Sequence, residues 1–179
     1  MAGTSLKQKL LNVAKVLTKL KIDYAIIGGL ALSVWAKPRA TYDLDFLTSL
    51  TKENLPLYLE SLKKVFIVPQ EKPIEFRHVT FLRMLTEKDL TVIDLVFADD
   101  QYKKMALRNR IQIKIGNRKL NFISAEDLII FKLLSGREQD ELDIKGIIEY
   151  QKGSLDLGYL RKIFKKFKLE RRFNEYFGK

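Results

Sequence analysis

The segment 24–47, YAIIGGLALSVWAKPRATYDLDFL, restricts the fold of this chain more than any other stretch. It reads as a short apolar strand, a Gly-Gly turn, a short helix that Pro38 ends, and a second strand. The second strand carries Asp43 and Asp45 in alternation with apolar residues. This spacing indicates a site that holds a phosphorylated ligand against a divalent metal.

The rest of the chain divides into an α/β part followed by an all-helical part. Before residue 124, the patterns predict helices at 5–21, 30–36, 52–65 and 99–108, and strands at 23–27, 41–47, 75–85, 90–97 and, as a hairpin, 111–123. From Ser124 they predict helices at 125–134, 138–151 and 155–168 and a short closing helix. Ser124 followed by Asp127 resembles a capping box that opens helix 125–134, and Gly136 is expected to end this helix. We therefore expect an α/β (α+β) fold, with a mixed sheet flanked by helices and a helical C-terminal subdomain. The predicted division is 1–123 and 124–179, and a single domain is the alternative.

The charge and composition of the chain limit the classes of partner and of site that it can have. The 33 Lys and Arg residues against 22 Asp and Glu give a net charge of +11, which favours nucleic acid or nucleotides as partners. A solvated basic surface is the alternative interpretation. The absence of cysteine and the presence of one histidine, His78, exclude disulfides, thiolate ligands and a multi-histidine zinc site. No segment has the length of apolar sequence that a membrane crossing needs, and the N-terminus lacks an export signal, so we expect a cytoplasmic protein.

The two carboxylates of the second strand are the first candidate ligands. Residues two apart in a strand face the same side, so Asp43 and Asp45 project together while Leu44 and Phe46 face the core. Mg²⁺ prefers hard oxygen ligands and is often held by one or two carboxylates together with substrate phosphates. We expect Mg²⁺ here, with Mn²⁺ as an alternative. A solvated strand face would produce the same pattern.

Residues around the Gly-Gly turn are suited to phosphate. Gly28 and Gly29 lie between a strand and a helix, where backbone N–H groups and the helix dipole can receive an anion. Arg39 can pair with a phosphate, and the Thr41 hydroxyl can hydrogen-bond one. A simple tight turn is the alternative for the glycine pair.

Asp94 is the single charge in the apolar run LTVIDLVF. A carboxylate among strand hydrophobics costs free energy unless it is paired or bound to a metal. As a third carboxylate, Asp94 could join the metal site and activate a hydroxyl for attack on phosphorus. A salt bridge to one of the many lysines is the alternative.

Together, the Gly-Gly turn, the pattern RxTxDxD and the isolated Asp94 resemble the nucleotidyltransferase superfamily, which has the fold of DNA polymerase beta. The form IIGGLALSVWAKPRATYDLDFL is most similar to the AbiEii-type branch, which includes toxins of abortive-infection systems. Downstream, SAEDLIIFKLLSGREQDELDI resembles the helical motif of that branch. The resemblance implies a nucleoside triphosphate substrate, a metal ion and transfer of a nucleotidyl group to an acceptor.

The resemblance also implies individual roles. Gly28 and Gly29 would grip the triphosphate, Asp43 and Asp45 would bind the metal, and Asp94 would be the third carboxylate. Lys132 would neutralise phosphate charge, and the helical motif would be formed by Arg137, Asp140 and Asp143. The sequence departs from the superfamily by having Gly-Gly in place of Gly-Ser, and its acidic pair follows Arg137 by three residues.

The helical region has its own physical interpretation. Lys132 lies on a mostly apolar helix, so its ammonium group needs a partner, which phosphate or Asp140 could provide. Asp140 and Asp143 are three residues apart and therefore face the same side of a helix. A surface ion-pair set is the alternative.

The C-terminal segment 152–179 has nine basic and three acidic residues with interleaved aromatic residues. RNA binding would explain this composition, but core packing explains Phe164 and Phe167 better, because they share a helical face with Leu160.

Two functions remain open. The first is a nucleotidyltransferase whose acceptor is tRNA or another RNA, or a small molecule such as an antibiotic. The second is a toxin of a toxin–antitoxin pair, or a regulatory nucleotide-binding module, whose basic face is covered by an acidic antitoxin partner. His78 is expected to be an ordinary strand residue.

Overall fold

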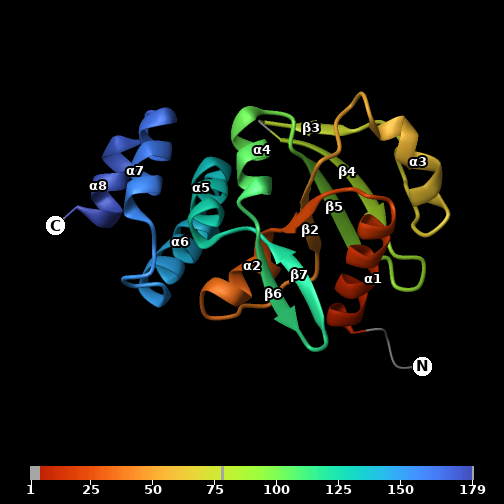
Figure 1. Ribbon diagram of the computed structural model, residues 1–179, viewed down its shortest axis with the longest axis horizontal. Coiled ribbons are helices and arrows are strands. Elements are labelled where there is room, and N and C mark those ends of the chain that lie inside the picture. Colours follow the sequence, from red (N-terminus) through yellow and green to blue (C-terminus); the bar gives the residue numbers. More distant parts are fainter. Residues whose placement is uncertain (1–4, 78, 179) are drawn as a thin grey trace. The chain divides into compact units, whose positions relative to one another are not determined.

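The computed structural model describes residues 5–77 and 79–178 (Figure 1). The chain forms two compact units. The first contains the residues up to Leu30 together with Ala40–Ile123, and the second contains Ala31–Arg39 together with the chain from Ser124. The sequence-based division at 123/124 differs from this grouping only in the segment Ala31–Arg39.

The first unit is built on one seven-stranded mixed sheet, as expected from the sequence. The strand order is β3-β4-β5-β2-β1-β7-β6. The pairs β2–β5 and β1–β7 are parallel, and the other neighbours are antiparallel. The strands are β1 (Tyr24–Ile26), β2 (Leu44–Thr48), β3 (Ile74–Phe76), β4 (Val79–Leu85), β5 (Val92–Phe97), β6 (Ile111–Ile115) and β7 (Arg118–Phe122).

The described residues form eight helices. Those numbered up to α4 are α1 (Leu6–Lys19), α2 (Gly28–Trp35), α3 (Leu55–Lys63) and α4 (Gln101–Arg108). The later ones, coloured teal to blue in Figure 1, are α5 (Ala125–Ser135), α6 (Glu138–Tyr150), α7 (Leu157–Lys166) and α8 (Glu170–Phe177). The division between the two units falls within α2, after Leu30. Among these helices, none has the length and apolar character that a membrane crossing requires.

Alternation along the central strands forms the core of the first unit. Leu44 and Phe46 of β2 are fully buried, whereas Asp45 between them is only half-buried. On β5, Ile93 and Leu95 are fully buried and flank the half-buried Asp94. The period-two pattern therefore separates a core face from a face that carries carboxylates, as predicted.

Helix α1 contributes to the same core. Its buried residues are Leu10, Val13, Ala14 and Leu17, and they form one apolar face of the helix that was predicted at 5–21. The Ser5 side chain caps this helix by accepting a hydrogen bond from the Gln8 N–H.

Three predicted elements need correction. The strand expected at 75–85 is two antiparallel strands, β3 and β4, because Arg77 adopts a left-handed conformation with φ 54° and reverses the chain. The helix expected at 30–36 already begins at Gly28. The strand expected from Thr41 begins only at Leu44. His78, expected in a strand, lies outside the described residues.

The second unit is a helical bundle with an aromatic cluster. Phe164 is fully buried, and its ring makes edge contacts with Phe173 and Phe177 at centroid distances of 5.4 and 6.3 Å. The packing role predicted for Phe164 is therefore confirmed. Ser124 caps α5 by accepting from the Asp127 N–H, and Gly136 ends it in the left-handed conformation, both as predicted.

Candidate active site

Three carboxylates mark one face of the first unit's sheet. Asp45 and Asp94 are direct register partners on the neighbouring parallel strands β2 and β5. Asp43 precedes β2 and is exposed. The strand pairing thus brings two carboxylates side by side, with a third just before one of the strands.

Asp45 lies against the backbone at the start of α2. The Ile27 N–H donates to the Asp45 carbonyl at 3.0 Å, which fixes β2 beside the end of β1. A Cβ atom at Gly28 would lie 2.1 Å from Asp45 Oδ2, and Gly28 has φ +65°. Both the close approach and the positive φ require glycine at position 28.

Thr41 lies against the second glycine. A Cβ atom at Gly29 would be 2.7 Å from Thr41 Oγ1 and 2.8 Å from Thr41 Cβ. The first N–H groups of a helix have no partner within that helix, and the helix dipole makes this end positive. Gly28 and Gly29 therefore place the start of α2 next to Asp45 and the Thr41 hydroxyl, with Gly29 buried and Gly28 and Thr41 half-buried.

Arg83 of β4 pairs with Asp94 and was not predicted from the sequence. Its Nε donates to Asp94 Oδ1 at 2.8 Å and its Nη2 to Asp94 Oδ2 at 2.7 Å. The hydrogen bonds to Asp94 raise the pKa of Arg83, and the negative charges of Asp43 and Asp45 add to this rise. The signal available in the sequence is that Arg83 is the single charge in the apolar strand FLRML, opposite Asp94 in the hairpin.

The donor set suits a hard divalent cation without forming a complete cage. Within residues 5–77 and 79–178, no three Asp, Glu or His side chains converge closely enough to hold a metal ion. Mg²⁺ needs only one or two carboxylates, because substrate phosphates and water supply the other ligands. The carboxylate oxygens of Asp43 and Asp45 meet this requirement by their chemistry, whereas those of Asp94 both accept hydrogen bonds from Arg83.

The second unit contains a buried ionic cluster. Lys132 Nζ lies 3.1 Å from Asp140 Oδ1 and 2.5 Å from Asp143 Oδ2. These three residues are only 4%, 1% and 5% exposed. Asp140 and Asp143 therefore do share one side of α6, and they supply the partner that the Lys132 ammonium group needs.

Two arginines complete the cluster. Arg39 donates to Asp143 from Nε and Nη2, each with a contact of 3.1 Å, and Arg137 Nε donates to Asp140 Oδ2 at 2.9 Å. Three cations thus surround two carboxylates. Arg39 and Lys132, which we expected to meet phosphate, both have carboxylate partners in this structure.

Burial and neighbouring positive charge have opposite effects on the pKa values of Asp140 and Asp143. Burial alone would raise the pKa of Asp140, but hydrogen bonds from Arg137 and Lys132 outweigh it and the pKa is lowered. For Asp143, burial is likewise outweighed by the hydrogen bonds from Arg39 and Lys132, and the pKa is lowered. Both carboxylates are therefore ionised at neutral pH.

The predicted site residues thus fall into two groups, each described within its own unit. Gly28, Gly29, Thr41, Asp43, Asp45 and Asp94 belong to the first unit, where Arg83 joins them. Arg39, Lys132, Arg137, Asp140 and Asp143 belong to the second unit.

The sequence of residues 5–176 matches the family described as "Nucleotidyltransferase of unknown function (DUF6036)". The chain belongs to this DUF6036 family. No curated protein sequence matches it. The family description does not mention AbiEii-type toxins, so that branch stays a prediction.

Solved structures share the fold of this DUF6036 protein. An antigenic nucleotidyltransferase-like protein from Paracoccidioides brasiliensis is 21% identical over 97% of both chains, with a TM-score of 0.54. The antibiotic-resistance factor ANT(2'')-Ia is 14% identical over 93% of this chain and 95% of its own, with a TM-score of 0.57. The lincosamide antibiotic adenylyltransferase LnuA is 17% identical over 82% of this chain and 98% of its own, with a TM-score of 0.52. At these identities the likeness concerns the fold.

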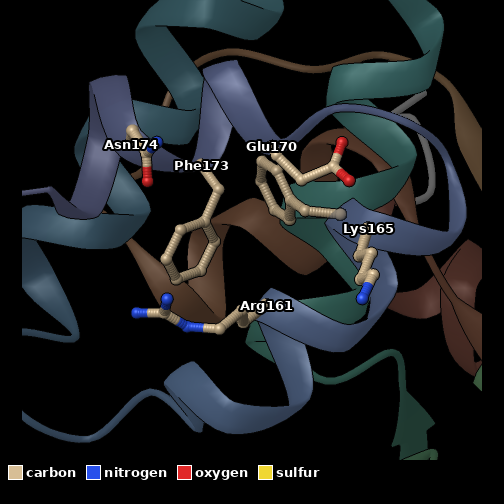
Figure 2. Close-up of a pocket in the computed structure, with 6 residues that line it drawn as sticks. Arg161, Lys165, Glu170, Phe173 and Asn174 are labelled. Atoms are coloured by element: carbon tan, nitrogen blue, oxygen red, sulfur yellow. The ribbon is translucent and has the colours of Figure 1, made fainter.

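The C-terminal helices of the DUF6036 chain combine buried aromatic rings with exposed cations. A pocket of about 330 Å³ is lined by Arg161, Phe164, Lys165, Glu170, Phe173 and Asn174. Figure 2 shows this pocket in close-up. The Arg161 guanidinium lies over the Phe173 ring, 4.8 Å from its centroid, and Phe173 is 4% exposed. Phe164 and Phe173 are therefore unavailable for base stacking, whereas Arg161 and Lys165, the cations that line the pocket, are exposed.

Proposed function

We propose that this member of the DUF6036 family is a Mg²⁺-dependent enzyme that moves a nucleotidyl group from a nucleoside triphosphate to an acceptor hydroxyl. The observation that carries the proposal is the pairing of Asp45 with Asp94 on adjacent strands, with Asp45 against Gly28 at the start of α2. Carboxylates beside an anion-accepting helix start combine a cation site with a phosphate site.

The roles follow from position. The Gly28 and Gly29 backbone and the Thr41 hydroxyl would bind phosphate oxygens, since they lie at the positive end of α2. Asp43 and Asp45 would hold Mg²⁺, or Mn²⁺ in its place, and Asp94 would contribute the third carboxylate. The bound cation would neutralise the charge that develops on the phosphate oxygens.

In the reaction, the acceptor oxygen would form a bond to the α-phosphorus while the bond from that phosphorus to the β-phosphate oxygen breaks. Pyrophosphate then leaves. Asp94 is the candidate to accept the proton of the acceptor hydroxyl, because its carboxylate lies beside Asp45 on the adjacent strand.

The ionic cluster of the second unit would offer positive charge to anionic groups of a ligand. Of its cations, Arg39 and Arg137 have side chains that are 37% and 69% exposed, whereas the Lys132 side chain is 5% exposed. We assign contact with anionic ligand groups to Arg39 and Arg137. We assign to Lys132 the positioning of Asp140 and Asp143.

For the acceptor we propose tRNA or another RNA. The net charge of +11 and the exposed Arg161 and Lys165 favour a polyanion. A small-molecule antibiotic is the alternative, since LnuA is a lincosamide adenylyltransferase and a structure of ANT(2'')-Ia contains adenylyl-2''-tobramycin.

Labelled nucleotides test the proposal. Each of the four NTPs, labelled at the α-phosphate, is incubated with Mg²⁺, the full-length protein and, separately, total RNA, tRNA or a set of antibiotics. We expect label in one acceptor pool, and a loss of at least about 100-fold in Asp45→Asn and Asp94→Asn. Asp23→Asn is the matched control, because Asp23 is 62% exposed and pairs with Arg110. No transfer with any NTP and acceptor would overturn the proposal.

A second candidate is a toxin whose basic surface is covered by an acidic antitoxin, with the same net charge as its support. Co-expression with the neighbouring open reading frames, followed by size-exclusion chromatography, tests it. A stable complex with an acidic protein supports this candidate. A lone protein whose expression leaves growth unchanged contradicts it.

A further inference from the structure

Arg83 places a permanent positive charge beside Asp94, on the strand that flanks β5 on the side away from β2. Its two hydrogen bonds reach both oxygens of Asp94, one from Nε at 2.8 Å and one from Nη2 at 2.7 Å. This is the bidentate arrangement that makes arginine–carboxylate pairs the strongest of their kind. The Asp94 side chain is 15% exposed, so water screens the pair only in part.

Arg83 and a divalent cation would compete for the same carboxylate, that of Asp94. A metal ion at Asp94 would need one of the two oxygens that accept hydrogen bonds from Arg83, and the guanidinium charge would repel the cation. The charges of Asp43 and Asp45 also act on Arg83, as the rise in its pKa indicates. Arg83 is therefore the counter-ion of Asp94 in this structure.

If Arg83 leaves Asp94, its guanidinium group still has solvent and the Phe81 ring to interact with. Its side chain is 46% exposed, and its guanidinium carbon lies 5.4 Å from the centroid of the Phe81 ring. Phe81 is two residues away on β4 and so shares its face. A rotation of the Arg83 side chain could keep the cation over the ring or in water while it releases Asp94.

We propose that Arg83 is a gating residue that excludes divalent cations from Asp94 in the free protein and releases Asp94 when a cation enters together with a nucleotide. The nucleotide then offers Arg83 a phosphate oxygen in place of the carboxylate. This inference rests on the proposed role of the three carboxylates as a cation site. It makes cation and nucleotide binding cooperative, and the free protein binds the cation weakly.

Cation binding tests the inference without any measurement of activity. Mn²⁺ alone is titrated into the full-length protein and followed by electron paramagnetic resonance of the free ion. The variants are Arg83→Met, which keeps the aliphatic stem, and Arg83→Lys, which keeps the charge but not the bidentate pair. The control Arg110→Met removes another ion pair of the first unit, that with Asp23.

We expect Arg83→Met to bind Mn²⁺ about tenfold more tightly than the unchanged protein, with Arg83→Lys between them and Arg110→Met unchanged. Asp94→Asn in the Arg83→Met background should remove the gain. Equal or weaker binding by Arg83→Met, or no binding by any variant, overturns the inference. If Arg83→Met fails to fold, Arg83→Lys decides by the same criterion.

The two proposals fail separately. Nucleotidyl transfer by the unchanged protein, combined with Mn²⁺ binding that does not depend on Arg83, would overturn the gating role alone. Arg83-dependent Mn²⁺ binding without transfer to any acceptor would overturn the proposed reaction and leave the gating role standing.

Discussion

Asp45 holds its carboxylate against the backbone of Gly28, so closely that a Cβ atom there would lie 2.1 Å from Oδ2. This contact joins the start of α2 to the acidic face of the sheet. A side chain at position 28 would displace Asp45 as well as strain the backbone.

Gly28→Ala should therefore destabilise the protein by more than the backbone penalty of about 1–2 kcal/mol for a left-handed alanine. Gly153→Ala is the matched control, because Gly153 has φ +82° and a Cβ there would meet nothing within 4 Å. Overpacking adds about 1–3 kcal/mol at position 28 alone. Urea unfolding measures the difference, and equal losses in the two variants would contradict the contact.

Lys132→Met should lower the free energy of unfolding by about 3–5 kcal/mol, since it leaves Asp140 and Asp143 buried with fewer cations. Lys145→Met on the exposed side of α6 is the control and should change stability by less than about 0.5 kcal/mol. Adding Asp140→Asn and Asp143→Asn to Lys132→Met should restore part of the loss. A Lys132→Met variant as stable as the control would show that the cluster does not stabilise the folded protein.

Acid should weaken the same cluster in a defined direction. The folded-state pKa values of Asp140 and Asp143 are lowered, so their stabilising contribution is fully present above the unfolded-state pKa of about 3.9. It is lost as the pH falls through the folded-state values, because the unfolded chain then binds protons more readily. Between pH 6 and 2, the free energy of unfolding should decrease more steeply with falling pH for the unchanged protein than for the double variant Asp140→Asn/Asp143→Asn. Parallel curves would contradict the shifts.

Tyr159→Phe should cost about 1.5–3 kcal/mol, the range for a hydrogen bond to a charged group. The Tyr159 hydroxyl donates to Asp127 Oδ1 at 2.6 Å, and Asp127 is completely buried at the start of α5. Tyr150→Phe removes a hydroxyl from a residue that is 67% exposed and serves as the control. Thermal unfolding of both variants measures the effect, and two equal melting temperatures would refute it.

Local patterns were sufficient for much of the fold and part of the site. Period-two alternation places Asp45 and Asp94 on one face of their strands, because Leu44, Phe46, Ile93 and Leu95 must be buried. The capping of α5 by Ser124 and its end at Gly136 depend only on neighbouring residues, and both are confirmed.

Local patterns could not predict contacts between residues that are distant in the sequence. Arg39 and Asp143 are 104 positions apart, and no local periodicity links them. The pairing of Arg83 with Asp94 depends on the register of β4 and β5, and a shift of one residue would place Arg83 on the other face. The break between β3 and β4 requires Arg77 to adopt a left-handed conformation, which its residue type does not indicate.

The second unit takes residues Ala31–Arg39 from a part of the chain made long before Ser124. On the ribosome, this segment must therefore wait for the last third of the protein before its unit can be completed. A fragment that starts at Ser124 would also leave Asp143 without Arg39, so residue 124 is a poor place to cut this protein for expression.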